Sequence, residues 1–315
     1  MQSLLHGSGA VDGGLTRIAL WVLLPILLNI AIGFVFERLR PIDPRTLSQT
    51  SIYVLSPCLV FHSLLTTKLT ARDIASIAAF VYVLTAAQWL VAKGWAKARR
   101  MSPGDEAAFI LSTVFMNAGN YGIPLCLYAF GSAGMERAVV WVLVQNAGIG
   151  SLAVYYAARE SVGVLQAVKT IFTMPAVYAA ALAGLLRLWH VSPPAYVMAP
   201  VQSLGLAMVP MAQLLLGAQL ARSAKYIKAD AGRIAEATAL RLVGSPFIGM
   251  AIAAGMGLTG LGAHVMVTLS SMPTAVNASI LAIEFGAQPR FVSGVVFCST
   301  VASFVTLTVL LRALG

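Results

Sequence analysis

The chain has 315 residues, of which 59% are hydrophobic and only 10% are charged, and its mean hydropathy is +0.84. An average soluble domain has about 25% charged residues, so most of this surface must face lipid, which argues against a soluble enzyme, a disordered chain or a nucleic-acid-binding module. The net charge of +10 then indicates cytoplasmic loops that follow the positive-inside rule rather than a polyanionic partner.

Uncharged apolar runs predict the membrane spans, because a spanning helix needs about 20 residues. The runs cover residues 18–36, 46–67, 74–92, 107–135, 138–158, 170–186, 188–221, 242–283 and 291–311. The seventh run begins with the loop signal Ser192-Pro193-Pro194, so its helix should start near Ala195. The eighth run is long enough for two helices, separated by a turn rich in glycine at Gly255, Gly257, Gly260 and Gly262. We therefore predict an all-α polytopic membrane protein with ten transmembrane helices.

Lysine and arginine predict the orientation of these helices. Most of the 21 basic residues fall in the loops that follow odd-numbered helices, for example Lys97, Arg99 and Lys225. The richer side should be cytoplasmic, which places both termini outside.

Prolines predict an internal repeat. Three pairs recur at a nearly constant offset in matching helices: Pro25 with Pro175, Pro57 with Pro210, and Pro124 with Pro273. This offset predicts a duplication with halves of residues 1–160 and 161–315. Because each half has five helices, an odd number, the second half must enter the membrane from the opposite side. Chance alignment among the 14 prolines is the alternative.

The fourth and ninth helices should be interrupted. Residues 117–124 (NAGNYGIP) and 270–277 (SSMPTAVN) combine helix breakers with small polar residues. In secondary transporters with inverted repeats, the substrate site lies at such interruptions near the middle of the membrane. The half-helices that follow would begin there with free N–H groups and positive dipole ends, and two crossing ends would form a site for an anion. The alternative is a pair of proline kinks packed by small residues.

Candidate binding residues come from these two segments and from the neighbouring fifth helix. They are Asn117, Gly119, Asn120, Gly122, Gln145, Asn146, Pro273, Thr274 and Asn277, with Pro124 and Pro273 as the crossover prolines. For the fifth-helix amides, hydrogen bonding between helices is an equally good explanation. Arg241, two turns into the eighth helix, is predicted to snorkel to the cytoplasmic interface, with attraction of an anion toward the inward vestibule as the alternative.

The remaining reactive residues argue against other classes of function. All 11 acidic residues fall at predicted helix ends or in loops, whereas a cation/proton antiporter should hold its ion on a carboxylate inside the membrane. The four histidines and three cysteines lack the spacing of a metal site or a disulfide framework. We see no catalytic set and no cofactor motif, so we predict no enzyme, no metal and no cofactor.

Residues 115–125 (FMNAGNYGIPL) and 272–286 (MPTAVNASILAIEFG) resemble the two signature stretches of the auxin efflux carrier family. That family includes the plant PIN-formed carriers and bacterial malonate and malate permeases. Further matches are Gly33 with the basic segment after it, Pro57 to His62 (PCLVFH), Pro210 with Gly217, and Gln145. Ala278 stands where the plant carriers have a second proline, and the segment between helices five and six is short. Both departures indicate the bacterial branch.

The resemblance implies both a fold and a function. Asn117, Pro124 and Pro273 match the family's fourth-helix asparagine and its two crossover prolines. The implied fold has a 5+5 inverted repeat with crossing fourth and ninth helices. Helices one, two, six and seven would form a scaffold and a homodimer face, and helices three to five and eight to ten would form a moving transport unit.

The implied function is secondary transport of small organic anions, mono- or dicarboxylates such as malonate or malate. Transport would occur by alternating access across the bacterial cytoplasmic (inner) membrane, with H⁺ or Na⁺ as the coupling ion. An ion antiporter or symporter of related fold and a non-transporting membrane sensor are the alternatives.

Overall fold

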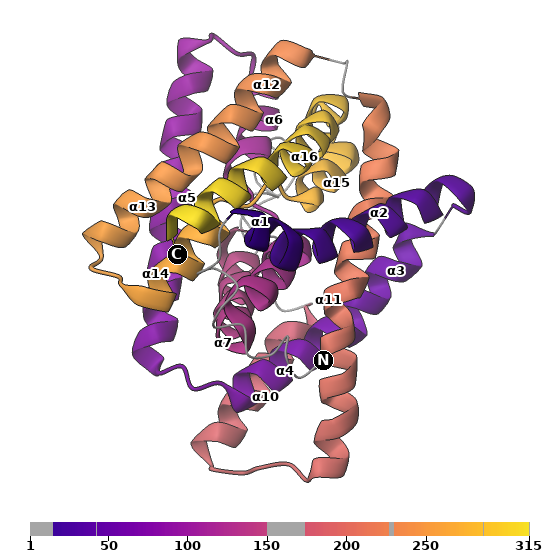
Figure 1. Cartoon of the computed structure of the whole chain (residues 1–315). Coiled ribbons are helices and arrows are strands. Elements are labelled where there is room, and N and C mark those ends of the chain that lie inside the picture. The colour runs from indigo at the N-terminus through magenta and orange to yellow at the C-terminus, as the bar shows by residue number, and fades with distance from the viewer. Residues whose placement is uncertain (1–14, 42, 150–173, 227–229, 286, 315) are drawn as a thin grey trace.

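The protein is built almost wholly of helices (Figure 1). The computed structural model describes residues 15–41, 43–149, 174–226, 230–285 and 287–314. The α-helices are α1 (Leu15–Ile18), α2 (Leu24–Leu39), α3 (Pro44–Thr50), α4 (Ser56–Thr66), α5 (Ala71–Ala98), α6 (Pro103–Val114), α7 (Ile123–Val144), α10 (Pro175–Leu188), α11 (Ala195–Ser223), α12 (Ala231–Ala239), α13 (Ser245–Gly255), α14 (Gly260–Ser270), α15 (Val276–Phe285) and α16 (Pro289–Leu314). Within these ranges the only β pairing is one bridge, so the predicted all-α class is confirmed.

Wide π-helical turns mark four of the prolines. The turns η2 (Ala19–Leu23), η3 (Ser51–Leu55), η4 (Ala118–Gly122) and η7 (Leu240–Gly244) end two residues before Pro25, Pro57, Pro124 and Pro246. A further π turn, η5 (Gln145–Ile149), follows α7, and a 3₁₀ turn, η6 (Ala224–Tyr226), follows α11. Proline lacks an N–H and clashes with the carbonyl four residues back, and a π turn removes that clash by widening the helix. These prolines therefore bend the chain without ending the helix.

Among the described residues, six helical stretches are long and apolar enough to cross a membrane. They are Thr16–Leu39, Ala71–Ala98, Ala118–Ala147, Ala195–Tyr226, Ala231–Gly255 and Pro289–Leu314. The predicted sixth and ninth spans contain shorter apolar helices, Pro175–Leu188 and Gly260–Ser270. The last part of the predicted fifth span and the first part of the sixth lie outside the described residues. The count of ten spans therefore stays a prediction.

Two of the predicted helix boundaries are confirmed. Residues 192–194 separate α10 from α11, and the glycine-rich segment separates α13 from α14. In that segment Gly257 and Gly260 have φ angles of 64° and 58°, which a residue with a Cβ rarely adopts.

The predicted boundary between the fourth and fifth helices is wrong. The charged pair Glu136-Arg137 suggested it, but the chain turns at Gly131, where φ is 67°. Glu136 lies inside the following helix, where it accepts a hydrogen bond of 2.6 Å from the Thr67 hydroxyl. A carboxylate with a polar partner can stay within the helix, whereas the left-handed turn requires glycine.

The helices pack in two groups. In the first, α11 packs along α2 and α4, and α4 packs on α10. The second group contains α5, α6, α7 and α12 to α16, in which α13 packs on α14 and α15 on α16. Glycines allow the closest approach in the first group, because a Cβ at Gly217 would overlap the carbonyl oxygen of Ile30, and one at Gly33 would overlap that of Leu214. The backbones of α2 and α11 are therefore in direct contact.

We expect Gly217→Ala to separate α2 from α11 and to destabilise the protein by about 1–3 kcal/mol, the usual cost of overpacking. The melting temperature of the purified protein in detergent should fall accordingly. Gly184→Ala in α10 is the matched control, because a Cβ at that position meets no atom within 4 Å. Equal melting temperatures for the two variants would contradict this account of the contact.

Candidate functional site

Two helices are interrupted at or beside the predicted segments. The second break falls within the predicted residues 270–277, but the first covers residues 115–117, and residues 118–124 of the predicted segment are helical. α6 ends at Val114, and the helical chain resumes in η4 at Ala118. α14 ends at Ser270, and α15 begins at Val276. Phe115, the residue that follows α6, has φ and ψ of −91° and 116°, an extended conformation. Each interruption leaves backbone groups without partners in their own helix.

The two interruptions satisfy each other's backbone groups through an antiparallel bridge between Met116 and Thr274. The N–H of Asn117 donates to the carbonyl of Pro273 over 2.8 Å. The N–H of Ala275 donates to the carbonyl of Phe115, also over 2.8 Å. Segments more than 150 residues apart in the sequence are thus held together at their backbones.

Asn117 caps the helix that follows the first interruption. Its side-chain oxygen accepts a hydrogen bond of 3.2 Å from the N–H of Asn120, as an N-cap residue should. The side chain is 4% exposed, and its amide nitrogen Nδ2 is buried without a hydrogen-bond partner in the described structure. A buried donor left unpaired costs about 1–3 kcal/mol, and in the described residues nearby Gln88 Nε2 and Thr268 Oγ1 share this state with Nδ2.

Thr274 pins the second interruption to two neighbouring helices. Its N–H donates to the hydroxyl of Ser299 in α16 over 3.1 Å, and its own hydroxyl donates to the carbonyl of Ser112 in α6 over 2.7 Å. All three residues are fully buried. The sequence singled out Thr274 but not Ser112 or Ser299, because the carbonyl of Ser112 and the hydroxyl of Ser299 reach Thr274 only through tertiary packing.

Gln145 holds the first interruption from the adjacent helix. Its side-chain nitrogen donates to the carbonyl of Met116 over 3.1 Å, and its oxygen accepts from the indole N–H of Trp141 over 2.9 Å. Interhelical hydrogen bonding, one of the two explanations for this amide, is therefore present. Asn146 follows in η5 with a half-buried side chain.

The other predicted site residues differ in how deeply they are buried in the protein around the interruptions. Asn277 is in the first turn of α15 with an exposed side chain, and Asn120 is half-buried. A Cβ at Gly119 would meet no atom within 4 Å, but one at Gly122 would lie 2.7 Å from the Cδ2 atom of Leu269. Gly122 therefore lets α14 approach η4 closely, whereas Gly119 has open space beside it.

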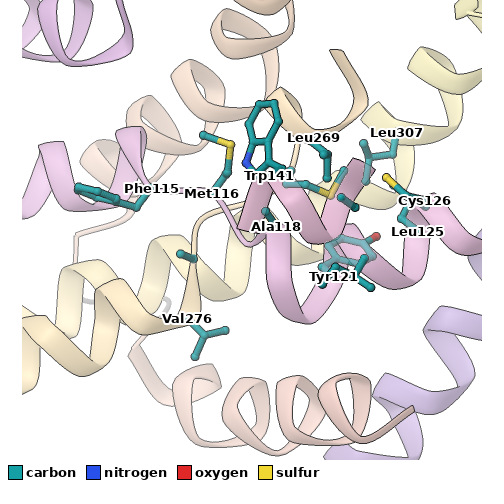
Figure 2. Close-up of a cluster of buried hydrophobic side chains, with 14 of the residues drawn as sticks. Phe115, Met116, Ala118, Tyr121, Leu125, Cys126, Trp141, Leu269, Val276 and Leu307 are labelled. Carbon is teal, nitrogen blue, oxygen red and sulfur yellow. The ribbon is translucent and has the colours of Figure 1, made fainter. Parts of the chain in front are cut away.

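Figure 2 shows a cluster of buried apolar side chains that includes residues of both interruptions, Met116 of the first and Val276 at the end of the second. Met116, Tyr121, Trp141 and Leu269 are all buried, and the Trp141 ring packs against that of Phe80 with 5.7 Å between their centroids. Such an environment has a low dielectric constant, which strengthens each hydrogen bond made within it and raises the cost of each one missed.

Arg241 occupies a different position from the one predicted. The snorkelling prediction is wrong, because the side chain is fully buried, with 0% exposure. Its guanidinium instead donates to backbone carbonyls at the ends of the interrupted helices: Nε to Met272 over 2.9 Å, Nη1 to Thr113 over 2.9 Å, and Nη2 to Ser270. Nη1 also lies 3.3 Å from the side-chain oxygen of Gln88, a residue of α5 that the sequence analysis missed.

Metal-binding side chains do not gather in this region. In the part of the chain that the structure describes, no three residues of the types His, Cys, Asp or Glu are grouped so that they could hold a metal ion. Cys58, Cys126 and Cys298 are free thiols. The chemistry available at the interruptions is therefore hydrogen bonding by amides, hydroxyls and backbone groups, together with the charge of Arg241.

Comparison with known proteins agrees with this arrangement. A family model described as "Membrane transport protein" matches residues 19–165 and again residues 158–311. An "Uncharacterized transporter" of Methanothermobacter thermautotrophicus is 28% identical over 292 residues, which cover 90% of this chain and 94% of that protein. The chain therefore belongs to the membrane transport protein family, the auxin efflux carrier family that its two signature stretches resemble.

Proposed function

We propose that the chain is a secondary transporter of small organic anions, mono- or dicarboxylates such as malonate or malate. The observation that carries the proposal is the buried, unpartnered amide nitrogen of Asn117 at the start of an interrupted helix. A substrate carboxylate would accept from this nitrogen. Asn120, Asn146, Asn277, Gly119 and Gly122 are proposed to complete the site, with Gln145, Pro273 and Thr274 beside it.

The balance of charge supports an anionic substrate. A helix N-terminus carries about half a positive charge, and two such ends, those of the η4–α7 helix and of α15, follow the interruptions. Neither residues 107–135 nor residues 237–283 contain an Asp or Glu, and residues 74–104 and 289–314 contain none either. The acidic residues of these helices lie in the first turn of α6 (Asp105 and Glu106), in the second half of α7 (Glu136) and in the last turn of α15 (Glu284). The segments next to the interruptions thus provide no acidic side chain, and a bound carboxylate would supply the missing negative charge.

Movement would follow the two packing groups of helices. We propose that α1 to α4, α10 and α11 form a scaffold and a homodimer face, while α5 to α7 and α12 to α16 move as a transport unit in alternating access. Halves of residues 1–160 and 161–315 would be related as an inverted repeat. The two segments that match the family model, each about half of the chain, support this division. H⁺ and Na⁺ are the candidate coupling ions.

We further propose that the protein lies in the bacterial cytoplasmic membrane with both termini outside. The connection between α5 and α6 and the one between α10 and α11 lie at opposite ends of the molecule (Figure 1). The first is rich in basic residues and should be cytoplasmic.

In a chain freed of its own cysteines, Lys97→Cys should be protected from a membrane-impermeant thiol reagent in intact cells, and Ser192→Cys should react. Both residues are exposed in the structure, so opening the cells should make Lys97→Cys reactive as well. Labelling of both positions from the same side would contradict the topology and, with it, the inverted repeat.

Asn117→Ala should weaken malonate binding by roughly 10- to 150-fold, since a hydrogen bond to a charged group contributes about 1.5–3 kcal/mol. Asn277→Ala should act in the same direction. Affinity is measured by titration of the purified protein, and transport by uptake of labelled malonate into proteoliposomes.

Asn117→Asp separates the two roles of that side chain. It keeps an oxygen to cap the helix but loses the donor and adds a negative charge, so the protein should fold while malonate binding is lost. Gln202→Ala, which removes an exposed amide from α11, is the control. Wild-type affinity in the Asn117 and Asn277 variants would exclude this site.

Pro124→Ala and Pro273→Ala should each impair uptake, and the double variant should be much worse. At Pro273, alanine restores an N–H and permits the helix to rewind across the interruption, which would pair the groups proposed to face the substrate. At Pro124, alanine removes the need for the wide turn η4 and would change the direction in which the helix leaves Asn117. Stability should hold or rise, because a continuous helix satisfies more backbone in lipid. Pro200→Ala in α11 is the matched control. A stable double variant with wild-type uptake would show that the prolines are tolerated kinks only.

A further inference from the structure

Arg241 is a buried cation without a carboxylate partner in the described structure. It lies in the π turn η7. The arginine ion pairs elsewhere in the described structure involve other residues, Arg99, Arg222 and Arg233. Desolvating a charge without an opposite charge costs several kcal/mol. Such a residue is retained inside a membrane only when backbone or side-chain oxygens compensate for it.

The compensation comes from the C-terminal ends of both interrupted helices. The guanidinium reaches the carbonyls of Thr113 and Val114, which end α6, and those of Ser270 and Met272, at the end of α14. A helix C-terminus carries about half a negative charge, so two of them together balance one guanidinium. The charge of Arg241 is therefore matched to the two helix ends as a pair.

The four carbonyl oxygens that Arg241 contacts are also the type of ligand that coordinates a coupling cation. In carriers with interrupted helices, unwound carbonyls and half-helix C-termini coordinate Na⁺, while the N-termini face the anionic group of the substrate. Here a guanidinium that stays charged at any physiological pH takes up those carbonyls. Its planar fork can bond to two helices at once, which a lysine ammonium does less well.

We propose that Arg241 is a resident cation that takes the place of a coupling Na⁺ at the C-terminal ends of α6 and α14, so that this carrier works without Na⁺. Arg241 is a positioning residue, because it bonds to the backbone of the interruptions and not to the proposed substrate. The proposal rests on the transport function proposed above for its uptake measurements, but its stability measurements are independent of any substrate.

The test compares the full-length wild type with Arg241→Met, Arg241→Lys and the control Arg137→Met. Arg137 is a half-buried arginine that donates to the carbonyl of Ala133 in its own helix. The melting temperature of each purified protein is measured in NaCl and in choline chloride at equal ionic strength. For wild type, for Arg137→Met and for Arg241→Lys, the melting temperature of each protein in NaCl should equal its melting temperature in choline chloride.

Arg241→Met should melt at a lower temperature in choline and recover by roughly 5 °C in NaCl, the shift expected from a saturated cation site. In proteoliposomes, wild-type uptake of malonate should be equal in the two salts. Uptake by Arg241→Met should be lost in choline and partly restored in NaCl. The Lys variant should keep uptake in both salts.

Two results would overturn the proposal: Na⁺-dependent melting and uptake in the wild type, or an Arg241→Met protein whose stability is the same in both salts. If Arg241→Met does not fold, a requirement of Arg241→Lys for Na⁺ would overturn it equally, and Na⁺-independent Lys activity would support it. Absence of malonate uptake in every protein, with the melting results as expected, would contradict the proposed substrate and leave the resident cation standing.

Discussion

The bridge between Met116 and Thr274 is the interaction on which the rest of the structure depends. In lipid, a backbone N–H or carbonyl without a partner costs several kcal/mol, so irregular backbone is tolerated only where protein satisfies it. Each interruption exposes such groups, and each supplies the partners of the other. Neither helix could be interrupted alone in a lipid environment, because its unpaired backbone groups would have no partners. The two motifs, far apart in sequence, therefore form one structural unit.

Polar side chains around this unit fall into two kinds. Gln145, Thr274 and Arg241 direct their donors to backbone carbonyls at the interruptions, so they hold the unit in place. The amide nitrogen of Asn117 has no such partner although it is buried among the same helices. The first kind accounts for why the break is stable. Gln88 Nε2 and Thr268 Oγ1 are also buried without a partner in the described structure, but of these three groups only Asn117 Nδ2 lies at the start of a helix. That position is why the second kind is the one proposed to bind a ligand.

The sequence predicted the local features of this fold well. Breakers such as Pro124 and Pro273 act on their own helix, and the glycines between α13 and α14 act on their own turn, so both are visible in a short stretch of sequence. The charges of Glu136 and Arg137 misplaced a boundary, because Thr67, 69 residues earlier, satisfies the carboxylate. The partners of Arg241 were likewise hidden, since Thr113 and Ser270 reach it only through tertiary packing. Hydropathy cannot distinguish an arginine that reaches water from one that caps two helices.

The C-terminal and N-terminal helix ends at the two interruptions are compensated differently, and this difference bears on how a carrier could work. At the C-terminal ends the counter-charge is covalently part of the chain, whereas the residues next to the N-terminal ends supply amides and no acidic side chain. A fixed carboxylate at the N-terminal ends would compete with an anionic substrate, and a fixed arginine beside them would hold it too strongly to release. Amide donors lie between these extremes, at about 1.5–3 kcal/mol for each hydrogen bond to a charged group. Transport requires binding that is favourable enough for entry and weak enough for exit. Under the proposed function, Arg241 therefore stabilises the crossing permanently, and Asn117 binds the substrate only transiently.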